Sequence, residues 1–299
     1  MILVTGATGN VGRRAVSELL AAGVAVRALT RSPDDAGLPD AAQLVRGDLS
    51  KPETVRAALK GGVEAVLFVW PLPTAKRAAA VLEVVAGHTS RIVYLSSLSV
   101  QDGLERQLDP ISACHAAIER LIERSGLRWN FLRPSGFATN TLVWAPQIRS
   151  GDTVRWPYGA ARRSLIDERD IAAVAARVLL DERRAGERHV LTGPQALSQV
   201  EQLDAIGEAV GRRLRYEETP PGRARQALFR AWGVPGIAAR VLPPGAFPRR
   251  MADGMIAAWA GMTKEPEPVT ETVQAITGAP AHTFRAWANE HAAQFRLGG

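Results

Sequence analysis

The chain has 299 residues, of which 46% are hydrophobic and 22% are charged. These values exclude a disordered protein, and the length suits one large α/β domain or a domain with a smaller cap. A single cysteine, Cys114, excludes a disulfide framework and a cysteine-rich metal site. The five histidines show neither HxH nor HxxxH spacing, so we expect no protein-bound metal.

The net charge of +7 comes almost entirely from arginine, because lysine occurs at only 4 positions and arginine supplies 33 of the 37 basic residues. A GC-rich genome explains this skew as well as a function does. Arginine pairs such as Arg162 and Arg163 are scattered, so we expect anionic ligands such as a phosphorylated cofactor rather than nucleic acid. No apolar run approaches the ~18 residues of a membrane span, and a strand-like segment starting at Ile2 leaves no room for a signal peptide. We therefore expect a soluble, cytoplasmic protein.

Strand-like and helical segments alternate through the first 135 residues. Apolar strands are predicted at 2–5, 25–30, 43–47, 65–69, 91–95 and 129–132, and helices at 11–22, 52–59, 75–86 and 112–125. Ser50 and Glu53 are predicted to form a capping box at the start of the second helix, around Pro52. Near-continuous apolar strands joined by helices predict a doubly wound parallel sheet, a Rossmann-type α/β fold.

After Pro134 the pattern loosens and aromatic residues become denser. Asp170 is predicted to be the N-cap of a helix that runs to Leu180, and residues 189–192 are predicted to return to the sheet. Further helices are predicted at 198–210, 222–232, 247–260 and 283–295. We therefore expect a domain over 1–135, to which residues 136–195 can add strands, and a smaller, mostly helical cap over 136–299 that is interwoven with it.

Gly6, Gly9 and Gly12 form a GxxGxxG motif between the first strand and the first helix. Glycines at this spacing allow a tight turn, close backbone approach to a pyrophosphate and close helix–strand packing. The helix N-terminus adds unpaired N–H donors and a positive dipole end. The motif in this context predicts dinucleotide binding; the alternative is a glycine-rich turn that only packs.

The end of the second predicted strand distinguishes the two nicotinamide dinucleotides. An acidic residue there binds the ribose 2′-hydroxyl of NAD, whereas a basic residue accommodates the 2′-phosphate of NADP. Arg31 stands at this position, and the first carboxylate after it is Asp34. Arg31 therefore favours NADP(H), unless it is simply a solvated arginine. Asp48, after the third strand, either meets the adenine amino group or caps the following turn.

Eight motifs are spread over nearly the whole chain. They are TGATGNVG at 5–12, LTRSP at 29–33, RGDLS at 46–50, YLSS at 94–97, SGLRWNFLRPSGFATN at 125–140, IDERDIA at 166–172, LTGPQALS at 191–198 and VTETVQAITGAPAHTF at 269–284. Together they resemble the NmrA-like family of atypical short-chain dehydrogenase/reductases. The resemblance implies a Rossmann domain, a C-terminal substrate-binding part and NADP(H) between them. Members of that family include quinone and triphenylmethane-dye reductases, redox-sensing regulators and tailoring proteins of secondary metabolism.

We expect residues of the glycine turn, of the strand ends and of the predicted helix at 112–125 to bind the cofactor. They are Gly6, Thr8, Gly9, Asn10, Val11, Gly12, Arg31, Asp48, Leu49, Val69, Trp70, Pro71, Ser96, His115, Pro134 and Ser135. Trp70 either stacks on the cofactor or a flat substrate, or fills the core. Phe137, Trp144, Trp156 and Tyr158 either line a pocket for a planar substrate or hold the cap on the sheet.

Two acidic residues, Asp167 and Asp170, are spaced three apart, which suggests acid–base chemistry. We interpret both as structural instead. One lies near a strand end, and the other caps a helix.

The Tyr-x-x-x-Lys pair of the wider superfamily is absent from the sequence. In that pair the lysine lowers the tyrosine pKa so that the phenol can exchange a proton during hydride transfer. Matching the Glu119 and Ser125 landmarks places Ile111 at the tyrosine position and His115 at the lysine position. Ordinary alcohol–ketone dehydrogenation is therefore not expected.

Two catalytic candidates remain. His115 either contacts the nicotinamide ribose or donates a proton, or is a helix residue without catalytic duty. Ser97 either binds a substrate carbonyl or satisfies the backbone at a strand end.

Three functions remain open at this point. The first is an NADP(H)-dependent oxidoreductase acting on a planar quinone-like or aromatic, polyketide-type substrate, whose product anion is delocalised. The second is a tailoring oxygenase of aromatic polyketide biosynthesis, and the third is a non-catalytic NADP(H)-sensing regulator. The GC-biased composition favours a setting in secondary metabolism. The sequence identifies neither the substrate nor the oligomeric state, monomer or homodimer.

Overall fold

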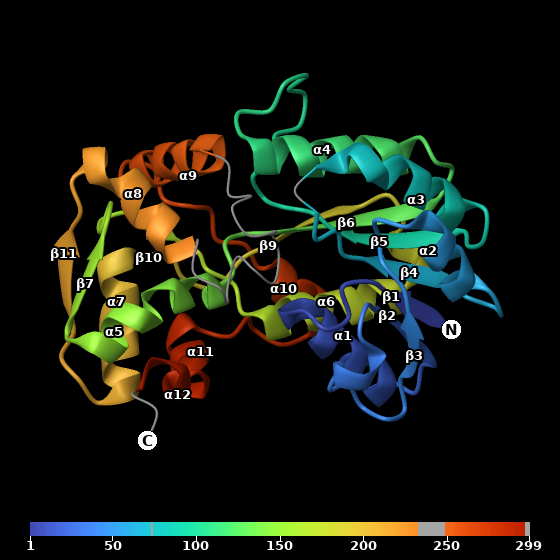
Figure 1. Ribbon diagram of the computed structural model, residues 1–299, viewed down its shortest axis with the longest axis horizontal. Coiled ribbons are helices and arrows are strands. Elements are labelled where there is room, and N and C mark those ends of the chain that lie inside the picture. Colours follow the sequence, from blue (N-terminus) through green and yellow to red (C-terminus); the bar gives the residue numbers. More distant parts are fainter. Residues whose placement is uncertain (73, 233–248, 297–299) are drawn as a thin grey trace.

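A seven-stranded sheet organises the chain between Ile2 and Leu191 (Figure 1). The computed structural model describes residues 1–72, 74–232 and 249–296. The strands lie in the order β3-β2-β1-β4-β5-β6-β9, and every neighbouring pair is parallel. They are β1 (Ile2–Val4), β2 (Val26–Thr30), β3 (Gln43–Arg46), β4 (Ala65–Phe68), β5 (Arg91–Leu95), β6 (Arg128–Pro134) and β9 (Arg188–Leu191). The predicted doubly wound fold is confirmed.

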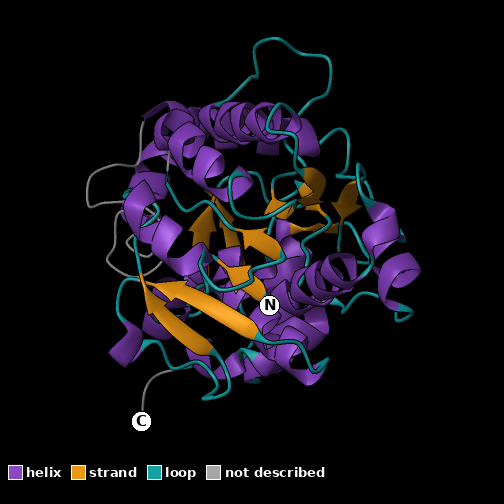
Figure 2. Cartoon of the chain, turned by 90° about the vertical axis from the view of Figure 1, so that its right-hand side faces the viewer, coloured by secondary structure: helices purple, strands orange, loops and turns teal. Residues whose placement is uncertain are grey.

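Helices cover both faces of this sheet, as Figure 2 shows from the side of the chain's N-terminus. α1 (Asn10–Ala21) and α6 (Glu168–Leu180) lie on one face; α2 (Pro52–Leu59), α3 (Ala78–Ala86) and α4 (Pro110–Glu123) lie on the other. Successive strand residues point to opposite faces, so Leu3 packs with the second group and Val4 with the first. Burial on both faces explains why the central strands β1 and β4 are continuous apolar runs, whereas the edge strand β3 is mostly exposed.

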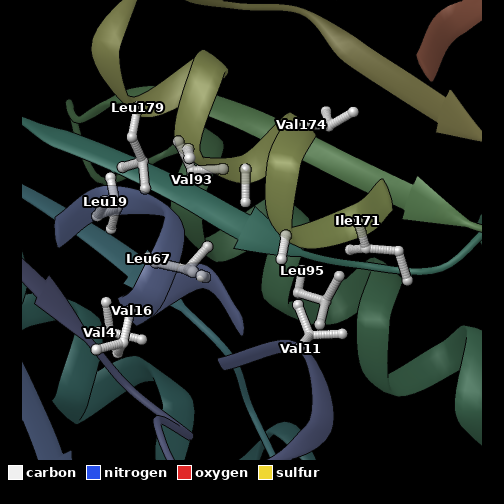
Figure 3. Packing of buried hydrophobic residues seen from close by; sticks show 14 of the residues in the cluster. Val4, Val11, Val16, Leu19, Leu67, Val93, Leu95, Ile171, Val174 and Leu179 are labelled. Carbon is white, nitrogen blue, oxygen red and sulfur yellow. The ribbon is translucent and has the colours of Figure 1, made fainter. Parts of the chain in front are cut away.

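The first face shows this packing in detail. Figure 3 shows side chains of α1 and α6 meeting side chains of three central strands, namely Val11, Val16, Leu19, Ile171, Val174 and Leu179 against Val4, Leu67, Val93 and Leu95. The order of the strands reverses between β1 and β4. In doubly wound sheets, ligands bind in the crevice outside the carboxyl ends of the strands at such a switch point.

The C-terminal part lies beside the sheet and is mostly helical, as predicted (Figure 1). Its helices are α5 (Ala145–Ser150), α7 (Gln199–Val210), α8 (Pro221–Trp232), α9 (Arg249–Met262), α10 (Thr272–Thr277), α11 (Phe284–Glu290) and α12 (Ala292–Phe295). It also contains two short ladders that the residue pattern does not predict: parallel β7 (Thr153–Trp156) with β11 (Arg215–Glu218), and antiparallel β8 (Arg162–Arg163) with β10 (Leu197–Ser198). A hydrophobic cluster containing Trp144, Trp156 and Trp287 holds these elements together.

Two predicted helix caps are wrong. Ser50 and Glu53 form no capping box, because the Ser50 backbone N–H donates to the Asp48 carboxylate and no side chain caps α2. Asp167, not Asp170, is the N-cap of α6, and its carboxylate accepts from the Arg169 backbone N–H at 2.8 Å. Asp167 has the extended backbone of a cap. Asp170, one turn inside the helix, is buried against a histidine from far along the chain.

Other helix boundaries also differ from the prediction. α4 begins two residues early, at Pro110, because Asp109 accepts hydrogen bonds from the first two free N–H groups of the helix. The predicted helix at 283–295 is interrupted at His291 and forms α11 and α12. α9 begins at Arg249, and residues 247–248 of that predicted helix lie outside the described residues.

Within the described ranges, no helix combines the length and apolarity that a bilayer crossing requires. The same residues contain no cluster of three histidine, cysteine or acidic side chains arranged to hold a metal ion.

Candidate functional site

The turn between β1 and α1 leaves no space for side chains at two of its glycines. Gly6 has a φ of +60°, which favours glycine, and a Cβ on it would lie 3.0 Å from the Val69 side chain. A Cβ on Gly12 would lie 2.2 Å from the Gly6 carbonyl oxygen. The helix therefore approaches the turn as closely as backbone atoms permit.

The first turn of α1 keeps free N–H donors. Its N-cap is Gly9, which has no side chain, and no acidic residue occurs in the first turn. Thr8 and Asn10 are exposed, whereas Val11 packs into the core. The backbone N–H groups and the positive end of the helix dipole thus remain free for an anion. These features fit the pyrophosphate of a dinucleotide.

Thr5, which the sequence analysis did not single out, joins the two strands at the switch point. Its Oγ1 donates to the Val69 carbonyl at 3.0 Å and accepts from the Val69 backbone N–H at 2.8 Å. These bonds hold the turn against the end of β4. In the sequence, the position of Thr5 directly before the glycine motif was the signal for this role.

Arg31 extends into solvent at the end of β2. In the described part of the chain, its side chain has no hydrogen-bond acceptor and no ion-pair partner. Its neighbour Arg46 is engaged, donating to the Arg31 carbonyl at 2.9 Å and pairing with Asp34 at 3.2 Å. The geometry therefore leaves Arg31 available for a 2′-phosphate.

Asp48 uses one carboxylate oxygen to cap the turn after β3. Its Oδ1 accepts from the Ser50 backbone N–H at 2.8 Å, and this bond holds the pKa of Asp48 below its ordinary value. Asp48 therefore caps the turn, as one of the two alternatives expects. Its second carboxylate oxygen can still accept a hydrogen bond from an adenine amino group. The next residue, Leu49, is buried in the core.

Trp70 follows β4 and is only 7% exposed. Its indole N–H donates to the Thr74 carbonyl at 3.1 Å, and its ring leans on Phe68 with 5.7 Å between centroids. These contacts favour the core-filling alternative. The adjacent Val69 and Pro71 are half-buried at the edge of the switch point.

His115 pairs with a tyrosine that the sequence analysis did not assign. The Tyr94 hydroxyl on β5 lies 2.7 Å from His115 Nδ1 on α4. Burial lowers the pKa of His115 to about 4, against opposing effects of nearby Glu119 and Asp109, and burial raises the pKa of Tyr94 well above 10.0. Both groups are therefore uncharged at neutral pH. In the Nε2–H tautomer, Tyr94 donates to Nδ1 and the Nε2–H remains free to donate.

The two serines after β5 have different surroundings. Ser97 is half-buried, and its Oγ lies 2.8 Å from Ser99 Oγ and accepts from the Ser99 backbone N–H at 3.2 Å. These contacts fit the alternative in which Ser97 satisfies the backbone at a strand end. Its hydroxyl can still form a further hydrogen bond. Ser96 is buried, and its hydroxyl donates to Glu119 on α4.

Glu119 also belongs to a buried ion pair. Arg133 on β6 donates to both of its carboxylate oxygens, at 3.0 and 2.6 Å, and to Asp102 at 2.9 and 2.7 Å. Breaking such a buried pair leaves an uncompensated charge, which is strongly destabilising. The network fixes α4, and with it His115, against the ends of β5 and β6.

The chain passes from β6 into the C-terminal part at Pro134. Ser135 is buried, and its hydroxyl donates to the Ser164 carbonyl at 2.5 Å. The half-buried Phe137 forms an isolated parallel bridge with Ile166. Two segments thus meet beside the carboxyl end of the sheet.

The remaining predicted pocket residues lie deeper in the C-terminal part. Trp144 and Trp156 are 1% and 2% exposed and meet edge to face, 6.4 Å between centroids. Their burial favours the packing alternative, although both border a small cavity. Tyr158 is half-buried with a φ of +58°, and its backbone N–H donates to Glu218.

The sheet order and the glycine turn at its switch point define a dinucleotide-binding Rossmann protein. A family model described as NAD(P)H-binding matches residues 6–182. The chain belongs to this family and to the NmrA-like branch of the atypical short-chain dehydrogenase/reductases, as its motifs predict. It is an NAD(P)H-dependent oxidoreductase.

Known proteins are similar to this chain over its whole length. A (4-alkanoyl-5-oxo-2,5-dihydrofuran-3-yl)methyl phosphate reductase of Streptomyces griseus is 36% identical over 299 residues, 99% of each protein. An NAD(P)H azoreductase of Xenophilus azovorans is 33% identical over 303 residues, again 99% of each. The structure of an NADPH-dependent quinone oxidoreductase of Escherichia coli has a TM-score of 0.75 at 21% identity, covering 97% of this chain and 99% of that one.

Proposed function

We propose that the protein is an NADPH-dependent reductase of planar, conjugated acceptors, such as quinones and unsaturated lactones, in secondary metabolism. The observation that carries this proposal is His115, which stands at the lysine position of the superfamily's pair, is half-buried, bonds to Tyr94 on β5 and is uncharged at neutral pH. Ile111, at the tyrosine position, has no proton to give. The acceptor must therefore tolerate hydride addition without a protein acid.

Conjugated acceptors meet this requirement. A nicotinamide bound at the switch point supplies the hydride. In a quinone or an enone, the two added electrons leave a delocalised anion on oxygen, and water protonates it. A simple ketone leaves a localised alkoxide instead, and such a reaction needs general acid catalysis. In this proposal, neutral His115 orients the cofactor through its free Nε2–H, and residues 136–299 bind the substrate.

The relatives support reduction of such compounds. The Streptomyces protein is named for a 5-oxo-2,5-dihydrofuran, in which a ring double bond is conjugated with a carbonyl group, and the Xenophilus protein is named as an azoreductase. Arg31 supports NADPH over NADH. The oxygenase and the sensor alternatives each predict a different result in the assay described next.

We expect NADPH to be consumed with a naphthoquinone and a butenolide enone, but at least about 100-fold more slowly with acetophenone, because general acid catalysis is worth about 10²–10⁴-fold. The assay follows NADPH absorbance under air and under nitrogen. Efficient ketone reduction would contradict the proposal. Oxygen-dependent product formation would indicate the oxygenase, and NADPH binding without consumption with any acceptor would indicate the sensor.

The quinone reaction should show no titration of His115 between about pH 5 and 9. A group with a pKa of about 4 is deprotonated throughout this range, so its acid form is absent. His115→Ala should lower kcat less than about 10-fold, because it removes a hydrogen bond and no proton donor. Tyr94→Phe is the matched control, since it removes only the partner of Nδ1. An activity loss of 10²–10⁴-fold, with a basic limb that disappears in His115→Ala, would instead identify His115 as the proton donor.

A further inference from the structure

Arg163, the last residue of β8, carries a charge that nothing in the described structure neutralises. The side chain is half-buried, its buried Nε has no hydrogen-bond acceptor, and no described carboxylate forms an ion pair with it. Its guanidinium lies over the face of Trp259, 5.9 Å from the ring centroid, which does not neutralise the charge. The preceding Arg162 differs, because it is 45% exposed and pairs with Glu201 at 3.4 Å. A desolvated, unpaired guanidinium is unfavourable unless a ligand supplies the anion.

The guanidinium lies beside the edge of the sheet where the cofactor is expected. A Cβ on Gly136 would lie 1.9 Å from Arg163 Nη2 and 2.9 Å from its Cζ, so the group rests directly on the Gly136 backbone. Gly136 follows Pro134 and Ser135 at the carboxyl end of β6. Because the strands are parallel, this is the edge that also carries the glycine turn.

Arg163 also borders the small cavity of the C-terminal part. This cavity is small, with a volume of about 20 Å³, enough for about one water molecule, and its mouth opens to solvent. It is lined by Asn140, Thr141, Val143, Trp144, Trp156, Arg163, Gln199 and Gln202. These lining residues include no acid, and the buried indole N–H of Trp144 also has no acceptor. Two unpartnered donors, one of them charged, therefore border one cavity.

The neighbouring amides do not compensate these donors. The Gln199 side-chain amide donates to the carbonyl of Pro157 at 2.9 Å, and that of Gln202 donates to the Leu197 carbonyl at 2.8 Å. The N–H groups of both amides are therefore committed to the backbone, and among the described residues neither amide oxygen bonds to Arg163 Nε or to the Trp144 indole N–H. A negatively charged acceptor in the cavity would satisfy both donors.

We propose that Arg163 binds an oxyanion of the conjugated substrate, such as a phosphate monoester, and thereby orients the substrate toward the cofactor. This inference rests on the proposed function and names the substrate class of the same site. The planar guanidinium offers paired donors that match two oxygens of such a group, and Trp144 offers a further N–H.

The first test compares a hydroxymethyl butenolide with its phosphate monoester. For the wild type, kcat/KM should be about 10–100-fold higher for the ester, mainly through KM, because charge-assisted hydrogen bonds are worth this much. Arg163→Gln should abolish the preference, because it should lower kcat/KM for the ester far more than for the alcohol. Arg163→Lys, which keeps the charge but not the paired donors, should retain part of it. Arg162→Gln, the matched control on the same strand, should keep the full preference.

Equal kcat/KM values for ester and alcohol in the wild type would overturn the inference. An equal loss for both compounds in Arg163→Gln would do the same, since it would indicate a structural role. Melting temperatures of the variants establish that they fold.

The second test measures binding without turnover. Calorimetry with the NADP⁺-loaded protein should show the ester binding about 10–100-fold more tightly than the alcohol, and Arg163→Gln should remove this difference without changing cofactor affinity. If no acceptor is reduced but this binding pattern holds, the anion site stands and the reductase proposal fails. If acceptors are reduced but the ester and the alcohol bind equally tightly, the reductase proposal stands and the anion site fails. Inorganic phosphate that binds as tightly as the ester would indicate a site for free phosphate and overturn the substrate assignment.

Discussion

Gly12→Ala is expected to weaken NADPH binding by about 100-fold or more, which corresponds to about 2.7 kcal/mol. The added methyl group would lie 2.2 Å from the Gly6 carbonyl oxygen, 2.8 Å from the Gly6 carbonyl carbon and 2.9 Å from Ala7 Cα. All three contacts are backbone atoms, so no side chain can move aside. The turn itself must open, and its N–H groups then lose the alignment that a pyrophosphate requires.

Calorimetric titration of NADPH into each variant measures this effect, and thermal melting establishes the folded fraction. Gly151→Ala is the matched control, because Gly151 has an extended backbone with φ 177° and a Cβ there meets nothing within 4 Å. It should bind NADPH as the wild type does. A folded Gly12→Ala protein with wild-type affinity would show that the cofactor does not use this turn.

Arg31→Ala should weaken NADPH binding by about 10–100-fold and leave NADH binding unchanged. A charge-assisted hydrogen bond between the guanidinium and the 2′-phosphate is worth about 1.5–3 kcal/mol, and NADH lacks that phosphate. The side chain is exposed and forms no hydrogen bond or ion pair with the other described residues, although its charge helps to hold the pKa of Asp48 low, so its removal costs little internal interaction. Because the site is exposed, added salt should weaken NADPH binding more than NADH binding.

Titration of both cofactors at two salt concentrations tests this expectation. Arg56→Ala on α2 removes the same charge from another exposed position and should leave the preference intact. Equal affinities of the wild type for NADPH and NADH, or a preference that survives in Arg31→Ala, would refute the assignment.

The sequence by itself determined the Rossmann sheet and its glycine turn. Strands buried on both faces must be apolar at successive positions, so β4 and β5 are visible as short continuous runs. The glycines are likewise a local requirement, because the contact between Gly12 and Gly6 spans only six residues. Such features are encoded within one strand, turn or helix, and their spacing is therefore readable along the chain.

Only the tertiary structure decided how distant polar groups are paired. Tyr94 meets His115 across β5 and α4, and Asp170 leaves its predicted capping role because His282, 112 residues later, binds it. Arg162 and Arg163 are neighbours on β8, yet among the described residues only Arg162 has a carboxylate partner. Charge neutralisation and burial depend on which elements pack together, and a pattern of residues along one segment carries no information about the partner that another segment supplies.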